Sequence, residues 1–461
     1  MKLAILAAAL TIGVPAMAIA AFWFSRMRGY LLSLMIFLTV LGAHGSINLL
    51  SHELYRGPDR GFEFTAADLV CWALTIAIVS RFPRRIEWFP RNTWLLALFF
   101  LNACILAATA AEPLFTAFSL WKCLRIFCLY WCTVNCLRLG THRRYVWLGY
   151  MGAASVLAVL AFQQKYLEGI YRIHGPFDHS NTIPLYANLI LPVLLIWGLC
   201  DRELPLWRSV ASIALSLGLL FAVICTFSRA GIAFAAGCFL CAVVWANLRS
   251  ASLRVRVRVH ATTAVLGLLM AAGIVRVAGP ILSRIQTAPK ASETARDEFN
   301  YAARLMLHDH PFGVGLNNFS YVLTTHTAYR ARFEAMKNEE TAGVAHHIYW
   351  LTAAETGYLG LALYLAIIVR FGWSALRGAL RGYGRNKSIH GTLLFGVFLG
   401  FCALQASGFY EWAFRLTPVM QLFVIQAAIA VSWAEERPRL RMVPAPVHEP
   451  LAIPVRQKSY S

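Results

Sequence analysis

The sequence predicts an all-α polytopic membrane protein with about 12 to 13 transmembrane helices and one large helical loop outside the membrane. Apolar residues make up 59% of the 461 residues and charged residues only 14%, against about 25% charged in an ordinary soluble domain. A soluble domain needs a charged shell around its core, and this chain has too few charges to build one. Soluble domains, disordered chains and disulfide scaffolds are therefore excluded as classes.

Apolar runs close to the roughly 20 residues that cross the hydrocarbon core recur along the whole chain. The predicted helices are 3–24, 31–50, 65–80, 94–111, 114–136, 147–163, 182–200, 209–227, 230–247, 260–280, 347–369, 391–409 and 416–434. The first run follows Met1-Lys2 and contains the small residues Ala16 and Ala18, so a cleaved signal peptide is an alternative there. The run stays apolar through Phe24, which suits a retained helix better.

The arginines and lysines between these helices are concentrated in alternate connections. The connections richest in them contain Arg81, Arg84, Arg85 and Arg91; Arg249, Arg254, Arg256 and Arg258; and Arg370, Arg377, Arg381, Arg385 and Lys387. The positive-inside rule makes these connections cytoplasmic. The net charge of +20 then reflects topology, and it is no evidence for a nucleic-acid partner.

The same rule divides the chain into four regions. Residues 1–280 form the N-terminal transmembrane helices, 281–346 an external helical loop, 347–434 the C-terminal transmembrane helices, and 435–461 a basic cytoplasmic tail that we expect to be disordered. The external loop carries equal numbers of basic and acidic residues. Its apolar residues recur at helical spacing over 299–307, so we expect a small folded cap on the membrane domain.

Two arginines lie outside the membrane at the ends of predicted helices. Arg172 opens the segment Arg-Ile-His-Gly-Pro-Phe-Asp-His-Ser-Asn, and Arg229 lies in the tight link Phe-Ser-Arg-Ala-Gly. Either arginine alone could simply extend to the membrane interface. Two that flank adjacent helices indicate an anion site, because guanidinium binds phosphate bidentately and keeps its proton.

Lys122 and Arg125 lie inside the apolar run 114–136, in its external half. Ionisable groups within a membrane helix are costly and usually face a polar interior. One interpretation is that both side chains extend to the external interface. The other is that they line a cavity for an anionic headgroup.

The external loop ends in Ala345-His346-His347 at the entry to a membrane helix, and Glu355, Thr356 and Gly357 follow. A histidine at the membrane surface beside candidate phosphate binders is a reasonable general base, since its ordinary pKa is near 6.5.

A metal site is an alternative for the histidines of the loop. His308 and His310 could join His346 and His347, but residues two apart on a helix point away from each other and no acidic cluster completes a site. We therefore expect no metal. A further external link holds Glu411 and Arg415, which could pair with each other.

Taken in order, these segments resemble the O-antigen ligase and Wzy-type polymerase superfamily of bacterial membrane glycosyltransferases. The matching segments are Arg172–Asn181, Ser228–Gly231, Ala303–Phe319 with its Pro-Phe-Gly-Val-Gly element, and His346–Gly357 with its Glu-Thr-Gly ending. Each motif is weak alone, and four in order are fairly specific. The resemblance covers residues 145–370 well and the N-terminal helices by hydropathy only.

The resemblance implies an enzyme of the bacterial inner membrane with its large loop in the periplasm. Such enzymes transfer a glycan from undecaprenyl diphosphate to another glycan, to lipid A–core or to a protein hydroxyl, without a cofactor. The family's catalytic residues correspond to Arg172, Arg229 and His346. With the residues named above, the expected substrate contacts are Lys122, Arg125, Asn181, His347 and Glu355. Other polysaccharide assembly proteins are possible partners.

Two departures from the family pattern leave questions open. The residue after the family's histidine is an asparagine, whereas here it is His347, so either imidazole could act. Family members are expected to have twelve helices with both ends inside, whereas thirteen helices with an external N-terminus are predicted here. Either the first helix is an addition or the chain has fewer helices than the thirteen predicted.

Two rival functions use the same features. A transporter or flippase of lipid-linked glycans would also need many helices and basic cavity residues, but no paired repeat between halves is visible. A channel or structural subunit of a polysaccharide machine would tolerate alanine at Arg172, Arg229 and His346. The sequence does not distinguish a ligase from a polymerase, although the histidine and Pro-Phe-Gly elements are closest to those of the ligases.

Overall fold

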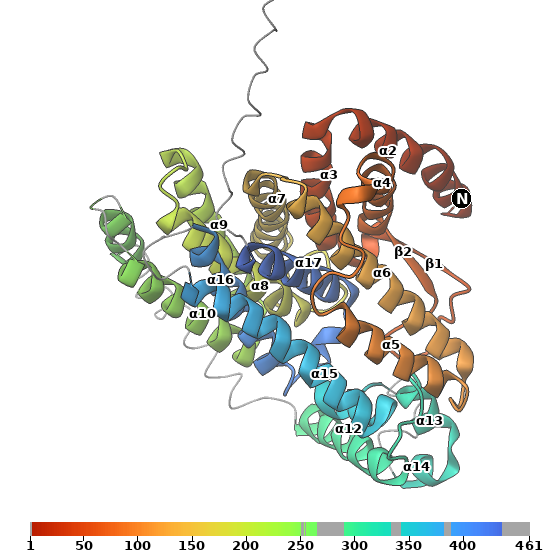
Figure 1. Cartoon of the computed structure of the whole chain (residues 1–461). Helices are drawn as coiled ribbons and strands as arrows, with labels where there is room; N and C mark the ends of the chain where they lie inside the picture. The colour runs from red at the N-terminus through yellow and green to blue at the C-terminus, as the bar shows by residue number, and fades with distance from the viewer. Residues whose placement is uncertain are drawn as a thin grey trace, which may run out of the picture.

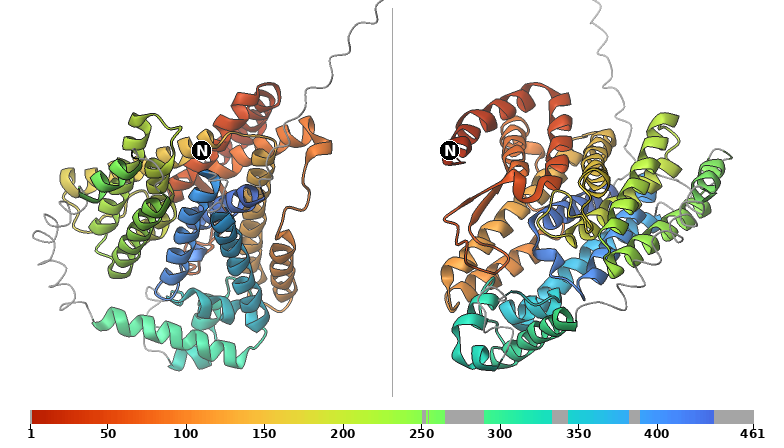
Figure 2. Two further views of the ribbon diagram at one scale, coloured as in Figure 1. Left: turned by 60° about the vertical axis from the view of Figure 1, so that its left-hand side comes forward. Right: turned by 180° about the vertical axis from the view of Figure 1, so that it is seen from behind.

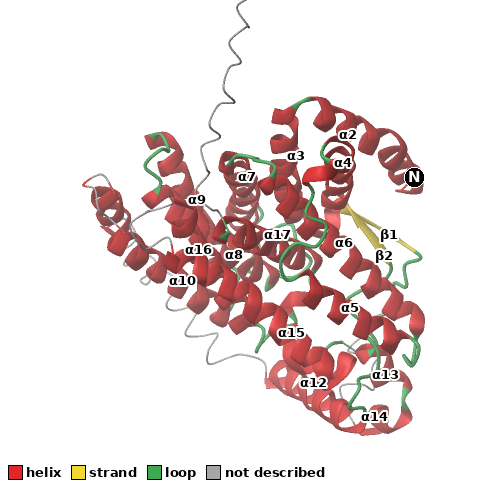
Figure 3. Ribbon diagram, viewed as in Figure 1, coloured by secondary structure: helices red, strands yellow, loops and turns green. Residues whose placement is uncertain are grey.

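The computed structural model describes residues 2–249, 253, 255–264, 290–332, 343–381 and 389–435, and these form a bundle of α-helices (Figures 1 and 3). Within these ranges, nine helices are long and apolar enough to cross a membrane. The predicted class, an all-α multi-pass membrane protein, is confirmed. The predicted helix at 260–280 lies outside the described residues beyond 264, and so does the predicted tail beyond Glu435.

The helices follow the predicted apolar runs closely in most places. The N-terminal elements are α1 (Lys2–Ala8), η1 (Ala9–Gly13), α2 (Val14–Trp23), α3 (Ser25–Leu38), η2 (Thr39–Gly45), β1 (Ser46–Leu49), β2 (Phe62–Thr65), α4 (Ala66–Arg81), η3 (Pro83–Arg85), α5 (Thr93–Ala107), α6 (Pro113–Arg138), α7 (Arg143–Phe162) and η4 (Gln163–Leu167). The later elements are α8 (Thr182–Cys200), α9 (Leu206–Cys225), α10 (Arg229–Arg249), α12 (Lys290–Asp309), α13 (Phe319–Thr325), α14 (Thr327–Arg332), α15 (Ile348–Arg381), α16 (Ile389–Ser407), η6 (Ala413–Arg415) and α17 (Thr417–Ala434).

The prediction of one helix over 31–50 is wrong. Helix α3 ends at Leu38, a 3₁₀ segment with a left-handed Gly42 (φ 55°) follows, and β1 then pairs antiparallel with β2 in a small hairpin. Glycine adopts this backbone conformation without the steric cost that other residues meet. Hydropathy alone does not show where the helix ends, because the short strand Ser-Ile-Asn-Leu follows the apolar run without a polar break.

Helix α8 lies at the centre of the bundle, and every residue from Thr182 to Leu199 is buried. Helix α16 packs closely against it through two glycines four residues apart: a Cβ on Gly396 would lie 2.9 Å from the Cα of Val193, and one on Gly400 would lie 3.0 Å from the Cα of Leu189. Small residues at this spacing let membrane helices approach each other. The antiparallel packing brings the start of α8 next to the end of α16.

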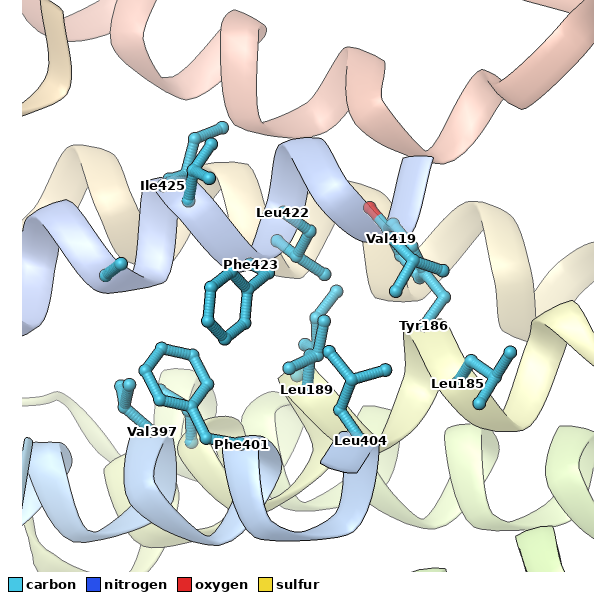
Figure 4. Packing of buried hydrophobic residues seen from close by; sticks show 14 of the residues in the cluster. Leu185, Tyr186, Leu189, Val397, Phe401, Leu404, Val419, Leu422, Phe423 and Ile425 are labelled. Atoms are coloured by element: carbon cyan, nitrogen blue, oxygen red, sulfur yellow. The ribbon is translucent and has the colours of Figure 1, made fainter. Parts of the chain in front are cut away.

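The core between α8, α16 and α17 is filled by aliphatic and aromatic side chains (Figure 4). Phe401 of α16 and Phe423 of α17 meet with ring centroids 4.4 Å apart, and Leu189 of α8 lies beside them (Figure 4). This packing fixes how α16 and α17 lie against each other.

Helices α12, α13 and α14 lie across one end of the bundle in every view (Figures 1 and 2). We call residues 290–332 the cap and this end of the bundle the cap end. Helices α8, α10, α15 and α17 all begin at the cap end, so the coil 168–181, the turn 226–228 and the link 408–416 gather there. The connections after α4, α6 and α8 lie at the opposite end, where Arg91 pairs with Glu435 at the end of α17 and Arg143 pairs with Asp201 at the end of α8.

The cap is joined to α15 through backbone hydrogen bonds at a kink. Gly357 of α15 has φ 69° and ψ −174°, which interrupts the helix. The Pro311–Gly315 segment binds there: Val314 N–H donates to Ala354 O (3.1 Å), Gly315 N–H to Glu355 O (3.0 Å), and Tyr358 N–H to Pro311 O (3.1 Å). The Pro-Phe-Gly-Val-Gly element is thus a backbone joint between cap and membrane helix.

Replacing Gly313 with alanine is expected to destabilise the protein by roughly 2–4 kcal/mol. Gly313 has φ 92°, and a Cβ there would lie 2.5 Å from the Glu355 carbonyl oxygen and the Gly357 nitrogen. The measurement is thermal unfolding in detergent. Gly237→Ala in α10 is the control, because a Cβ there meets nothing within 4 Å. Equal melting temperatures for the two variants would contradict the claim that the backbone joint at Gly313 stabilises the protein.

Candidate functional site

Arg172 lies in the coil between η4 and α8 at the cap end, and two tethers hold this coil. The buried side-chain amide of Gln164 accepts from the backbone N–H groups of His174 (3.0 Å) and Gly175 (2.8 Å). Arg172 itself donates from Nε to the Thr226 carbonyl oxygen (2.9 Å) and from its terminal guanidinium nitrogen to the Asn181 side-chain oxygen. The guanidinium therefore has a fixed orientation beside the start of α8.

Arg229 is the exposed first residue of α10. The start of α10 packs against α8, because a Cβ on Gly231 would lie 2.5 Å from the Cβ of Pro184. The turn that precedes Arg229 contains Thr226, whose carbonyl accepts the hydrogen bond from Arg172. The two sequence-predicted arginines therefore flank the same corner of the cap end.

Glu411, in the link between α16 and α17, is the centre of a polar cluster. Its Oε1 accepts a hydrogen bond from the Asn181 side-chain amide and lies 3.4 Å from a guanidinium nitrogen of Arg296, which belongs to α12. Its Oε2 lies 3.4 Å from Nδ1 of His346. The Glu411 side chain is 16% exposed. One carboxylate thus connects the Arg172–Asn181 pair, the cap and His346.

The two adjacent histidines have different surroundings. A carboxylate only accepts hydrogen bonds, so a neutral His346 carries its proton on Nδ1 toward Glu411 and has its lone pair on Nε2. His347 instead accepts the Trp350 N–H at Nδ1 (3.3 Å), so its Nε2 carries the proton. The His347 ring lies edge-on to Phe409, with centroids 5.4 Å apart, and burial lowers its pKa below the ordinary value.

Lys122 and Arg125 are both buried and paired with carboxylates of the protein. The Lys122 ammonium binds Asp59. Arg125 binds Glu63 (2.8 Å) and Asp68, and its side chain is only 1% exposed. These partners come from the β1–β2 hairpin and the first turn of α4. The pairing favours a structural role for both cations over the expected contact with an anionic headgroup.

Replacing Lys122 with methionine is expected to destabilise the protein by about 3–5 kcal/mol, because it leaves the buried Asp59 carboxylate unpaired. Although burial alone would raise the pKa of Asp59, Lys122 and the Ser119 hydroxyl outweigh it and lower that pKa. The variant K122M/D59N removes the unpaired charge and should recover most of the melting temperature. A double variant that is stable but no longer binds lipid-linked glycan would instead favour a substrate contact.

Glu355 is fully buried in α15 and binds Arg415 of η6. The pair of Glu411 with Arg415 that the sequence allowed does not form, because the two residues of the link face different partners. The backbone carbonyl oxygen of Arg415 also accepts a hydrogen bond from the Lys122 ammonium (2.8 Å). Because a carboxylate in the membrane requires a counter-charge, we interpret Glu355 as a structural partner of Arg415.

An apolar cavity of about 280 Å³ lies between α5, α6, α15 and α17. Its walls are mainly leucine, isoleucine, phenylalanine and valine side chains, and among the described residues that line it Arg415 alone is charged. Arg172, Arg229 and His346 do not line it. The polar cluster around Glu411 and the apolar cavity are thus separate features.

The histidines considered as metal ligands do not converge. His308 and His310 are exposed at the end of α12, where His308 Nδ1 lies 3.2 Å from its neighbour Asp309, whereas His346 lies at Glu411. Over the described ranges, no group of three or more His, Cys, Asp or Glu side chains is arranged to hold a metal ion.

The fold and the cluster define a class: a multi-pass membrane protein whose polar site lies at the end that carries a folded cap. Residues 213–365 match the family model for O-antigen ligases. The match spans about a third of the chain and includes Arg229, the cap, His346 and Glu355. The match confirms the resemblance of this part of the chain to the O-antigen ligase and Wzy-type family, and it supports a membrane glycosyltransferase of the ligase or polymerase type. No curated protein matches the chain.

The sequence alone does not indicate the central position of Glu411 or the contribution of Arg296. Glu411 was noted in an external link, but its partners Asn181, Arg296 and His346 come from three distant segments. Its signal in the sequence was that an acidic residue stood in a short link at the end predicted to hold both arginines. Nothing in the helical pattern distinguishes Arg296 from the other charged residues of α12.

Proposed function

We propose that the protein transfers a glycan from undecaprenyl diphosphate to an acceptor hydroxyl, with inversion at the anomeric carbon and without a metal ion. The observation that carries this proposal is the polar cluster itself. Arg172 and Asn181 are joined to His346 through Glu411 at the cap end of the bundle, with Arg229 at the same corner. The match of residues 213–365 to the O-antigen ligase family model supports it.

The two arginines would stabilise the leaving diphosphate. When the bond between the anomeric carbon and the phosphate oxygen breaks, its electron pair goes to the diphosphate, where negative charge accumulates. Guanidinium groups of Arg172 and Arg229 aimed at this charge act more strongly in a partly dry site than in water. Their permanent charge lets them do so without a change of protonation.

His346 would act as the general base. Its Nε2 lone pair takes the proton from the acceptor hydroxyl as the acceptor oxygen forms its bond to the anomeric carbon. The proton then leaves the imidazolium for the solvent or the released diphosphate. Because the acceptor attacks opposite the leaving group, the configuration inverts. His347 is less suited to this role, since its Nδ1 caps the start of α15.

The orientation of the protein in the membrane follows from the positions of its basic residues. The arginine-rich connections lie opposite the cap end, and the positive-inside rule makes them cytoplasmic. We therefore infer that the cap and the polar cluster face the periplasm of a bacterial inner membrane, where a carrier lipid presents its glycan. The cap would position the acceptor, either glycan, lipid A–core or protein.

The test is transfer by the purified protein in lipid vesicles. Radiolabelled undecaprenyl-diphosphate glycan and a candidate acceptor are incubated with the protein, and the product is analysed by mass spectrometry and by the anomeric coupling in its NMR spectrum. We expect an inverted glycosidic linkage whose formation is insensitive to EDTA. Activity abolished by EDTA and restored by a divalent metal would contradict the proposal. Movement of the donor across the vesicle membrane without product would indicate the flippase alternative.

A deletion strain separates ligase from polymerase. Loss of all long chains from lipid A–core indicates a ligase. Lipid A–core that carries only a single repeat, or loss of a free exopolysaccharide, indicates a polymerase.

A further inference from the structure

Glu411 occupies the point where four segments of the cap end meet. Its two carboxylate oxygens contact Asn181 at the start of α8, Arg296 of the cap, and His346 at the entry to α15, while the residue itself lies in the link between α16 and α17. These segments are far apart in the sequence. The helix packing that brings them together, above all the close approach of α8 and α16, therefore places this carboxylate with little freedom.

The two oxygens of Glu411 have separate partners. Oε1 accepts from Asn181, whose side-chain oxygen accepts from Arg172, so this oxygen fixes the phosphate-binding side of the cluster. Oε2 faces Nδ1 of His346 at 3.4 Å. The carboxylate thus sets the distance between the arginine and the imidazole.

The contact at Oε2 determines which imidazole nitrogen can take a proton. Because the carboxylate cannot donate, it holds the hydrogen of His346 on Nδ1 and leaves the Nε2 lone pair available. Once Nε2 is protonated, the imidazolium lies next to a negative charge that stabilises it. A carboxylate behind a catalytic histidine has this pair of effects in hydrolases, where its loss costs about 10⁴-fold in kcat.

We propose that Glu411 is a positioning residue for glycan transfer: it orients His346 as the base and connects it to the Arg172–Asn181 pair. This inference rests on the proposed function. The charged groups that face the imidazole are Glu411 on the link and, across the same carboxylate, Arg296 on α12. Arg296 fixes the other side of Glu411 and thereby couples the cap to the base.

The first variant for the test is Glu411→Gln. The amide keeps the size of the side chain and one carbonyl oxygen, so Asn181 retains an acceptor, but the amide cannot compensate an imidazolium charge. We expect kcat for transfer to fall by about 10²-fold or more, with the KM for the lipid-linked donor changed less than about twofold. Glu411→Asp should recover part of the lost kcat, because it restores the charge at a greater distance.

Glu168→Gln is the matched control. Glu168 is an exposed glutamate at the cap end whose side chain accepts from Gln163 (2.7 Å), so its replacement should leave kcat and KM unchanged.

A double variant separates positioning from a structural role. In a His346→Ala background, Glu411→Gln should lower kcat less than about twofold, because the residue it orients is gone. A structural residue would add its full effect to that of His346→Ala. Size-exclusion chromatography and thermal unfolding of each variant accompany the kinetics.

The outcomes distinguish the two proposals. No transfer by the wild-type protein with lipid-linked glycan would defeat the proposed function itself. Wild-type transfer that depends on His346 but is unaffected by Glu411→Gln would leave that function standing and overturn the role of Glu411. Additive losses in the double variant, or loss of the folded protein in both Glu411 variants, would also overturn it.

Discussion

Replacing His346 with alanine is expected to lower kcat for glycan transfer by about 10²- to 10⁴-fold, the usual contribution of general base catalysis. The Nε2 lone pair of His346 is free to accept the acceptor's proton because Nδ1 faces Glu411. The donor should still bind, since the arginines that would hold its diphosphate remain. Transfer is measured in vesicles, and donor binding separately with the labelled lipid.

His347→Ala is the matched control for this prediction. It removes an adjacent imidazole whose Nδ1 caps α15 and whose ring packs against Phe409. We expect a lower melting temperature but a kcat within about tenfold of wild type, since loss of a helix cap costs roughly 1 kcal/mol. The reverse pattern, with His346→Ala active and His347→Ala inactive, would show that the wrong imidazole had been chosen.

Alanine at Arg172 or Arg229 is expected to lower the transfer rate by about 10²- to 10³-fold, as the loss of one donor to a developing charge does elsewhere. Arg172→Lys should not restore activity. A lysine ammonium cannot bind Thr226 and Asn181 through separate nitrogens while presenting a planar face to phosphate. The measurement is kcat and KM with the lipid-linked donor.

Arg138→Ala serves as the control for the arginine variants. Arg138 forms a partly exposed ion pair with Glu87 at the opposite end of the bundle, and such surface pairs contribute little. Its replacement should leave transfer unchanged. Full activity of Arg229→Ala would remove Arg229 from the proposed mechanism.

The positions of the membrane helices could be predicted from the sequence because the hydrocarbon core imposes a fixed length on every apolar run. Helices α8, α10 and α17 begin within one residue of the predicted positions. The hairpin after α3 and the kink at Gly357 were not predictable in this way. Both depend on glycines with positive φ and on backbone partners distant in the sequence.

The candidate site was predictable only in part. Arg172, Arg229 and His346 were named because polar residues at helix ends near an external loop are unusual. Lys122 and Arg125 are candidates for a different reason, namely that ionisable groups inside an apolar run are costly, yet they bind Asp59, Glu63 and Asp68. Whether a buried cation meets a carboxylate of the chain or a ligand depends on tertiary contacts, and hydropathy contains no information about them.

The backbone joint between Pro311–Gly315 and the kink of α15 has a practical consequence for exchanging the cap with that of a similar protein. A chimaera that replaces only the loop between two membrane helices would separate Val314 and Gly315 from the carbonyl groups of Ala354 and Glu355, to which their N–H groups donate hydrogen bonds. The transferable unit therefore extends through Tyr358. Grafts cut at residue 346 should express poorly, whereas grafts cut after the kink should yield folded hybrid enzymes.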